Sequence, residues 1–331
     1  NIAWSKALPE TGQSTVVIKD GRLFYTCYQP LEADGELGSN IVAYCADAQT
    51  GDVLWQRKIR GQYPLRLSGC FSDSTSPPAV TDGERVCFFN ASGTLTCFDM
   101  QGDQLWSREA MAVGRSQPFL VHGNVVFTKQ TIMPKDGKFG HEHKDASQEL
   151  WTQLEALELA SGEHVWTSTC GVNMGAVPMV SRWSDGREVI VVGRGGGHSP
   201  PERPLGVSAI DGKSGKTLWT LPLERYMSTQ TFAMINDRAL IFHGPEHLWV
   251  DPSGKVERRV NLCTDVKVRR WEGSSYVSQI ETLNYKPGKG RAITQQSNLL
   301  VGDYHYFRAY TETYLGRVHV RTGKVEYLQL P

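Results

Sequence analysis

The chain has 331 residues, and its 35 Lys and Arg are balanced by 35 Asp and Glu, so its formal net charge at pH 7 is zero. This balance argues against nucleic acid or an anionic membrane surface as the main partner, because both favour proteins with a basic excess. Hydrophobic residues make up 40% of the chain, which is enough for a folded core, yet no apolar run approaches the ~20 residues of a membrane helix. The 33 Gly, nine Trp, 12 Tyr and 11 Phe predict many short strands joined by tight turns.

One expected unit of four strands recurs six times along the chain. Its second half is a strand, a glycine turn and a further strand, and in most copies the fourth residue after the glycine is aromatic. Glycine allows the positive φ of a tight hairpin turn, and alternating residues on both sides are typical of strands. The turn glycines are Gly51, Gly102, Gly162, Gly215, Gly254 and Gly323. The fourth residue after each is, in the same order, Trp55, Trp106, Trp166, Trp219, Arg258 and Tyr327.

The first half of each unit is also a strand, a short turn and a strand, as around Asp20-Gly21 and Asp82-Gly83. Four strands repeated in this way are typical of propeller blades, whereas a β-sandwich does not need the same unit six times. The sequence therefore predicts an all-β fold, a single propeller domain over residues 1–331 made of four-stranded antiparallel blades. In chain order the blades are expected at residues 14–58, 76–109, 117–169, 177–223, 231–262 and 293–330.

The first residues do not fit into any of the six units. Residues 1–8 include Trp4 and resemble the Trp-bearing fourth strand of a blade whose other three strands are missing. The last unit already has its own fourth strand at 324–330. We therefore expect an orphan closing strand at 1–8 and a chain that is a fragment of a ring of seven or eight blades. The alternative is that this segment forms no blade strand.

The repeat resembles a known family. The copies AYCADAQTGDVLW at 43–55 and GVSAIDGKSGKTLW at 206–219 resemble the pyrroloquinoline-quinone (PQQ) type of propeller repeat, and the resemblance covers essentially the whole chain. That repeat occurs in quinoprotein dehydrogenases and in cofactor-free relatives, including a periplasmic scaffold lipoprotein of outer-membrane assembly. The chain looks most similar to secreted bacterial PQQ-like repeat proteins.

This resemblance implies a periplasmic or extracellular location and a non-catalytic binding or assembly scaffold, monomeric, with a protein or glycan partner. The alternative is a quinoprotein-like oxidoreductase or a carbohydrate-active enzyme with its site at the channel mouth. The adjacent cysteine pair of many quinoprotein enzymes is absent, and so are the haem signature C-x-x-C-H and the hydrolase signature G-x-S-x-G. No cofactor is therefore expected, although PQQ with calcium stays as an alternative.

In the family, the repeat tryptophan docks between neighbouring blades against a small residue. The resemblance therefore implies that Trp55, Trp106, Trp166 and Trp219 are structural. The small positions hold Cys45, Cys97, Ala156 and Ala209. The seven cysteines form no metal-binding spacing, and cross-strand disulfides Cys27–Cys45 and Cys87–Cys97 are both conceivable.

Two further hypotheses concern the loops. His141 and His143 are candidate metal ligands, because alternate residues of an extended segment face one side, but a solvated polar insertion explains them as well. In an up-and-down blade the tight turns lie on one face of the ring, and the long segments lie on the other, around the channel mouth. These long segments are expected at 29–40, 59–75, 130–151, 194–205 and 262–292, and the face on which they lie is expected to gather His247, Arg269, Arg270 and Tyr276 as well.

Loops on a rigid scaffold are where binding usually occurs. We therefore predict a ligand site at the long-loop face, formed by residues beside strand ends. Guanidinium groups next to an aromatic side chain would suit a carboxylate-bearing glycan or a peptide. The alternative is that these loops only pack on one another to close the ring. The predicted site residues are Arg66, Arg115, His243 and Trp271.

Overall fold

The structure is a computed structural model, and its described residues contain strands and turns but no helix. They are residues 2–29, 40–62, 73–110, 116–129, 151–173, 175–194, 205–224, 232–284, 293–294, 298–309 and 313–329. The chain divides into two compact units. Unit 1 comprises Asn1–Met174, His198–Pro201 and Lys213–Gly215, and unit 2 comprises Gly175–Gly197, Glu202–Gly212 and Lys216–Pro331.

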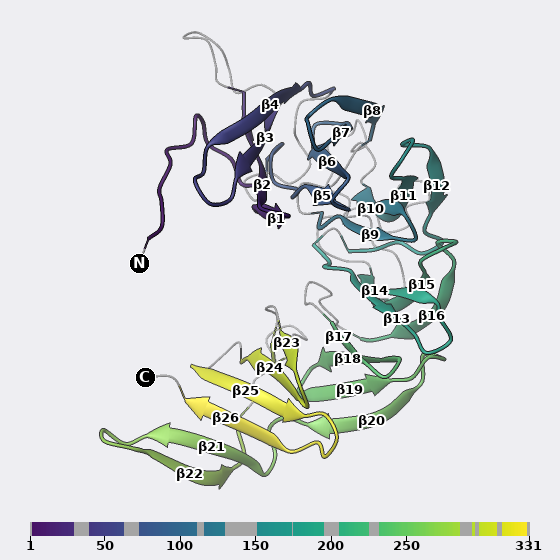
Figure 1. The fold of residues 1–331 in the computed structure, drawn as a ribbon. Helices are drawn as coiled ribbons and strands as arrows, with labels where there is room; N and C mark the ends of the chain where they lie inside the picture. Colours follow the sequence, from purple (N-terminus) through teal and green to yellow (C-terminus); the bar gives the residue numbers. More distant parts are fainter. Residues whose placement is uncertain are drawn as a thin grey trace, which may run out of the picture. The chain divides into compact units, whose positions relative to one another are not determined.

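Unit 1 contains three four-stranded antiparallel sheets, each in simple up-and-down order (Figure 1). The first sheet is β1 (Val17–Lys19), β2 (Arg22–Tyr28), β3 (Ile41–Asp47) and β4 (Val53–Ile59). The second is β5 (Val80–Thr81), β6 (Arg85–Asn90), β7 (Thr94–Asp99) and β8 (Gln104–Glu109). The third is β9 (Phe119–Val121), β10 (Asn124–Lys129), β11 (Gln153–Glu158) and β12 (His164–Thr167).

Unit 2 contains two further sheets of the same kind and a sixth, larger one. The fourth sheet is β13 (Met179–Arg182), β14 (Glu188–Arg194), β15 (Gly206–Asp211) and β16 (Thr217–Pro222). The fifth is β17 (Ala233–Ile235), β18 (Arg238–His243), β19 (Glu246–Val250) and β20 (Val256–Asn261). The sixth contains β23 (Leu299–Val301), β24 (Tyr304–Arg308), β25 (Tyr314–His319) and β26 (Val325–Gln329), together with two additional strands. The expected fold class, four-stranded antiparallel blades without helix, is therefore confirmed.

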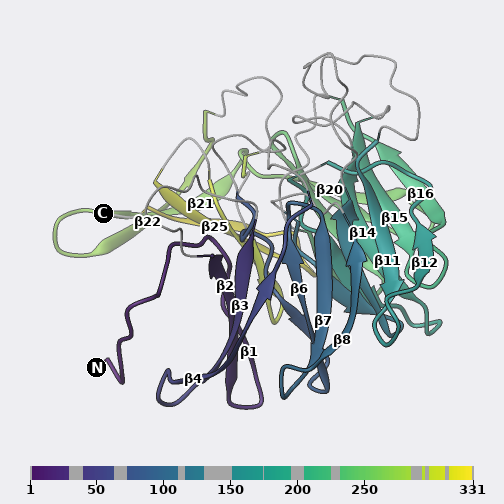
Figure 2. The same ribbon diagram turned by 90° about the horizontal axis from the view of Figure 1, so that it is seen from above.

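The tight turns have the backbone conformation that their residues suggest. Asp20 and Gly21 have φ of 48° and 73°, and His122 and Gly123 have φ of 49° and 73°. Two successive residues with positive φ form the hairpin turn whose twist matches that of the flanking strands. In unit 1 the turns that join β1 to β2, β3 to β4 and β7 to β8 lie at one end of the strands (Figure 2).

In each of the first five sheets a bulge precedes the residue four places after the turn glycine, and it decides which face of the sheet that side chain occupies. In the first sheet Trp55 pairs with Cys45 but Val53 pairs with Ala46, so Leu54 is an extra residue. The same shift occurs at the corresponding place in the second to fifth sheets. In the sixth sheet the pairing of β25 with β26 shows no such shift. A register change of one residue turns a side chain to the opposite face.

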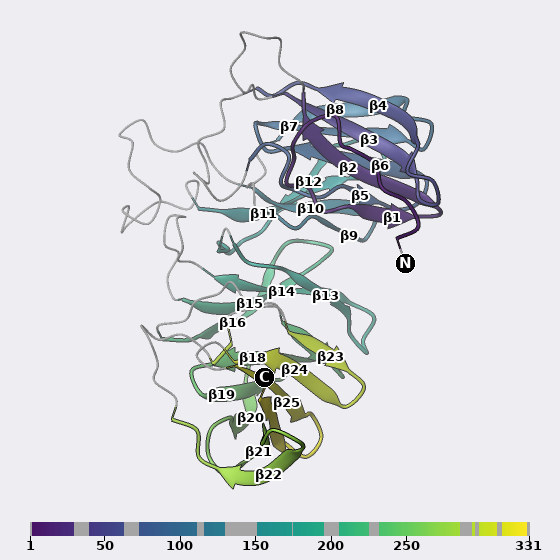
Figure 3. The same ribbon diagram turned by 90° about the vertical axis from the view of Figure 1, so that its left-hand side faces the viewer.

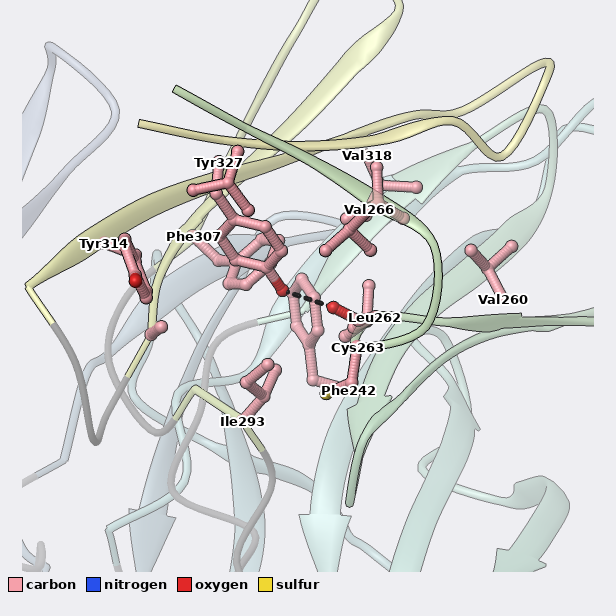
Figure 4. Close-up of a cluster of buried hydrophobic side chains, with 13 residues drawn as sticks. Phe242, Val260, Leu262, Cys263, Val266, Ile293, Phe307, Tyr314, Val318 and Tyr327 are labelled. Atoms are coloured by element: carbon pink, nitrogen blue, oxygen red, sulfur yellow. Dashed lines mark hydrogen bonds between the residues drawn. The ribbon is translucent and has the colours of Figure 1, made fainter. Parts of the chain in front are cut away.

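Tyr327 is therefore turned towards the core of unit 2, and it is only 1% exposed. Its hydroxyl donates a 2.7 Å hydrogen bond to the carbonyl of Leu262, directly after β20. Figure 4 shows this bond and the packing of Tyr327 beside Phe307 and Phe242. The contact ties the sixth sheet to the end of the fifth.

The prediction of a long loop at 262–292 is wrong for the first part of that range. Strands β21 (Val266–Trp271) and β22 (Tyr276–Glu281) form an antiparallel hairpin there, and β21 pairs in parallel with β26 (Figures 1 and 3). The hairpin thus widens the last sheet to six strands. Val266 and Val268 are buried while Lys267 is exposed, and this alternation explains why the segment is a strand.

The orphan strand expected at 1–8 is not a strand in the described part, residues 2–8, because no strand of the described chain pairs with it. Trp4 nevertheless occupies the place that the repeat predicts. Its Nε1 donates a 3.2 Å hydrogen bond to the carbonyl of Ala48, and a Cβ on Gly51 would lie 2.7 Å from its ring. Trp4 therefore docks on the first sheet as the repeat tryptophans dock on theirs, although its own segment does not pair as a strand.

Candidate functional site

The four repeat tryptophans, Trp55, Trp106, Trp166 and Trp219, are buried between successive sheets. Trp55 and Trp106 are 8% and 7% exposed, and their indole nitrogens each donate a 3.0 Å hydrogen bond to a backbone carbonyl of the following sheet, that of Met100 and that of Leu159. Each ring also lies on the turn glycine of the following sheet. A Cβ on Gly102 would lie only 2.8 Å from Trp55. These glycines are thus needed for close approach as well as for their positive φ.

The same contact recurs with variations. Trp166 covers Gly215, one of the turn residues grouped with unit 1, and Trp219 covers Gly254. In the fifth sheet Arg258 takes the tryptophan position. Its Nη1 donates a 2.9 Å hydrogen bond to the carbonyl of Arg321, and its guanidinium lies 5.5 Å from the ring centre of Trp249. The four tryptophan rings are buried and offer no open face to a ligand, whereas Arg258 is half-buried.

The β21–β22 hairpin presents the best-defined candidate surface of the described chain. Trp271 is 46% exposed and packs edge-on against Tyr276, with ring centres 5.2 Å apart. The guanidinium of Arg269 lies 5.5 Å from the centre of the same tyrosine ring. Backbone pairing holds the three side chains on one face, because Trp271 is the partner of Tyr276 and Arg269 is the partner of Ser278. We call Arg269, Trp271 and Tyr276 the hairpin cluster.

An ion pair on the other face of the hairpin stabilises it. Arg270 binds Glu281 through two hydrogen bonds of 2.9 and 2.6 Å, the planar arrangement that arginine and a carboxylate favour. The carboxylate of Glu281 raises the pKa of Arg270, and the guanidinium lowers the pKa of Glu281. Both groups are therefore charged at neutral pH, and the two strands are joined next to Trp271.

The hairpin cluster continues onto the same face of β24–β26. Arg317 lies 4.3 Å from the centre of the Tyr304 ring, and its Nε donates a 2.8 Å hydrogen bond to Glu326. A cavity of about 160 Å³ opens here; it is lined by Arg269, Tyr306, Leu315, Arg317 and Leu328, among others. Aromatic, arginine and leucine side chains beside a cavity of this size can hold one side chain of a partner.

A histidine pair lies in the interior of unit 2. His247 Nε2 and His305 Nδ1 are 2.9 Å apart, and His305 Nε2 lies 2.6 Å from Oδ1 of Asn298. Burial lowers the pKa of His305 to about 4 and lowers that of His247 well below 6.5. Both rings are neutral at pH 7 and fully buried. His247 therefore belongs to the core rather than to the long-loop face where the sequence placed it.

The predicted ligand residues are only partly described. Arg66 and Arg115 lie outside the described residues, and so do His141 and His143. His243 ends β18, where its Nε2 is 3.1 Å from the carbonyl of Glu224, and Trp271 ends β21. These two residues belong to different sheets, and no contact between them is seen in the described chain.

Sequence reasoning took the hairpin for irregular loop, although a signal for it was present. Val266 and Val268 alternate with the polar residues at 265, 267 and 269, and a Glu-Gly-Ser-Ser turn precedes Tyr276. Alternation on both sides of a glycine turn predicts a hairpin. The segment matches no copy of the four-strand repeat, so the repeat pattern alone does not predict it.

The comparisons with known proteins agree with this geometry. The family model described as outer membrane protein assembly factor BamB matches residues 1–168, which is just over half of the 331 residues. The chain belongs to this PQQ-like repeat family. No curated protein matches it. Within the described residues, no helix is long and apolar enough to cross a membrane.

Solved structures of PQQ-like proteins show the same propeller fold. BamB from Moraxella catarrhalis is 12% identical, with a TM-score of 0.50, and the match covers 93% of this chain and 70% of that one. A europium-containing methanol dehydrogenase is 10% identical, with a TM-score of 0.56, and the match covers all of this chain and 80% of that one. Identities this low establish the fold and leave the activity open.

Among the described residues, no three His, Cys, Asp or Glu side chains lie close enough to hold a metal ion. The four repeat tryptophans, which could serve as platforms for a flat ring, are covered by the glycine turns of neighbouring sheets.

Proposed function

We propose that this PQQ-like chain is a non-catalytic scaffold that binds a protein partner through the β21–β22 hairpin, in the periplasm or at the cell exterior. The supporting observation is the exposed Trp271, which packs edge-on against Tyr276 beside Arg269 in a hairpin that no other repeat of the described chain contains. Tryptophan, tyrosine and arginine are the residues that dominate the binding energy of protein interfaces.

The family supports a protein as the partner, because the matched family is described as an assembly factor. The composition of the hairpin supports the same class. Ile280 is 68% exposed and lies on the same face as the hairpin cluster, opposite Lys267. An apolar and aromatic centre with a charged rim is typical of a protein interface.

A photo-crosslinking residue placed at position 271 tests this proposal in the cells that make the protein. Leu105 on β8 is a matched control, because its side chain is also 46% exposed but belongs to an ordinary repeat. We expect one discrete protein adduct from position 271 that is absent from position 105 and is lost on Arg269→Glu. Equal adducts from both positions, no adduct, or an adduct that stains for carbohydrate would contradict the proposal.

The enzymatic alternative is tested on the purified protein. An absorbance spectrum and elemental analysis report any bound quinone or calcium. Either group at one equivalent per chain would overturn the scaffold function, whereas their absence together with the adduct at position 271 supports it.

A further inference from the structure

Two cysteines of the second sheet face each other across neighbouring strands. Cys87 on β6 and Cys97 on β7 are register partners in an antiparallel pair. Directly opposed residues of such a pair have Cα atoms about 4.5 to 5.5 Å apart and side chains on the same face. A disulfide needs Cα atoms about 4.4 to 6.8 Å apart. The backbone therefore already holds these cysteines at bridging distance.

The two side chains share one face of the sheet, and both are fully buried. The one hydrogen bond seen for the Cys97 thiol in the described chain is a long one, 4.0 Å to the carbonyl of Leu159. Their surroundings are the apolar core between the second and third sheets, which includes Trp106, Phe89 and Val125. Burial and the neighbouring thiol raise the pKa of Cys87 well above its usual value, so the folded thiol is a poor nucleophile. Any bond between them must form while the chain folds.

The other cysteine pair that the sequence suggested lacks this geometry. Cys27 is the register partner of Val42, and Cys45 is the partner of Phe24. Because Cys27 and Phe24 are three residues apart on one strand, the two thiols point to opposite faces of the first sheet. Cys27 and Cys45 accordingly belong to separate apolar clusters. They provide an internal control for the opposed pair.

We propose that Cys87 and Cys97 form a structural cross-strand disulfide when the chain folds in the presence of a disulfide oxidant. The two thiols lose two protons and two electrons as the S–S bond forms. The disulfide of the oxidant, such as oxidised glutathione or an exported thiol oxidoreductase, breaks and takes them up as two thiols. The bond closes the β6–β7 hairpin beneath Trp106, which pairs with Cys97 on the next strand. The inference is independent of the proposed partner binding.

Refolding of the full chain tests it. The reduced, unfolded protein is refolded with a mixture of reduced and oxidised glutathione, alkylated under denaturing conditions and weighed. We expect two fewer alkylated cysteines and, before alkylation, a mass about 2 Da below that of the reduced protein. Chymotryptic cleavage after Phe88 or Phe89 separates the two cysteines, so the linked peptides should be found joined until a reductant is added.

Two variants distinguish this pair from the other cysteines. Cys45→Ala should still form the bond, so Cys87 and Cys97 should again escape alkylation. In Cys97→Ala the bond cannot form, so Cys87 should be alkylated. Full alkylation of every cysteine in the refolded wild-type chain, or a bond that joins Cys87 to any other cysteine, would overturn the proposal.

Discussion

At the residue scale, the indole hydrogen bond separates tryptophans that otherwise look equivalent. Trp106 donates to Leu159, whereas the indole nitrogen of Trp219 is buried without an acceptor in the described chain. Both rings cover a turn glycine, and both are 7% exposed. The two positions therefore share packing and differ in hydrogen bonding.

We expect Trp106→Phe to destabilise the protein more than Trp219→Phe, by roughly 1 to 2 kcal/mol, because it removes the indole donor to the buried carbonyl of Leu159 and leaves only the long, weak hydrogen bond from the Cys97 thiol. Both variants lose similar ring volume, so each serves as the packing control of the other. The midpoint of urea denaturation measures the difference. Equal losses would show that the hydrogen bond makes no net contribution.

Acidification should act through the histidine pair. Unfolded histidine titrates near 6.5, whereas folded His305 titrates at about 4 and folded His247 also below 6.5. The folded-state pKa is depressed, so the stabilisation is complete above about pH 6.5 and is lost as pH falls towards 4. Each group contributes up to about 1.4 kcal/mol per pH unit in that window. Arg258 disfavours protonation of His247 further.

The thermal midpoint measured between pH 7.5 and 4.5 tests this expectation. His247→Leu combined with His305→Leu should reduce the loss of stability on acidification, whatever it does to stability at pH 7.5. The exposed His164 is the matched control, and His164→Gln measures the effect of removing a histidine outside the core. An identical pH dependence in the double variant would show that other groups control acid sensitivity.

At the scale of the element, the turn glycines that lie under a tryptophan must have a positive φ and must leave room for the indole ring. Gly102 meets both, with φ of 85° and Trp55 directly over it. Gly123 also has positive φ, at 73°, but a Cβ there would meet nothing within 4 Å. A side chain at Gly123 would therefore cause backbone strain alone, whereas a side chain at Gly102 would cause backbone strain and also collide with Trp55.

We expect Gly102→Ala to cost about 1 to 3 kcal/mol more than Gly123→Ala, because only the first forces Trp55 away from its pocket. Urea denaturation followed by tryptophan fluorescence measures both stability and the displacement of the ring. If the two variants lose the same amount of stability, the close approach of Trp55 is not a determinant of docking.

The contact of Tyr327 with Leu262 gives a second prediction at this scale. Tyr327→Phe removes one buried hydrogen bond and keeps the ring, so we expect a loss of about 1 kcal/mol. Hydrogen exchange should show faster opening of β26 and β21, which flank this contact, and unchanged protection in β18. Faster exchange spread evenly over unit 2 would contradict a local role.

For the whole molecule, the fold follows from a pattern rather than from residue identity. Relatives only 10% to 12% identical share it, because strand alternation, glycine turns and one large docking side chain are sufficient to build each sheet. We expect a far-UV circular dichroism spectrum of strand and turn with less than about a fifth helix. A larger helical fraction would be incompatible with this architecture.

The sequence alone determined the all-β class, the six repeats and the turn glycines, and the family resemblance implied the docking role of the four tryptophans. The strands and turns depend on local φ preferences and on side-chain alternation, which neighbouring residues set by themselves. Even Arg258 keeps the docking position that its place in the repeat predicts, since the bulge before it is retained.

Only the tertiary structure decided the features that depend on register. The missing bulge before Tyr327 turns that side chain into the core, and the pairing of β21 with β26 converts an expected loop into an exposed hairpin with Trp271. Register also separates Cys87 and Cys97, which face each other, from Cys27 and Cys45, which do not. A shift of one residue reverses the face of every side chain in a strand, and the contacts that fix this shift come from residues distant in the chain.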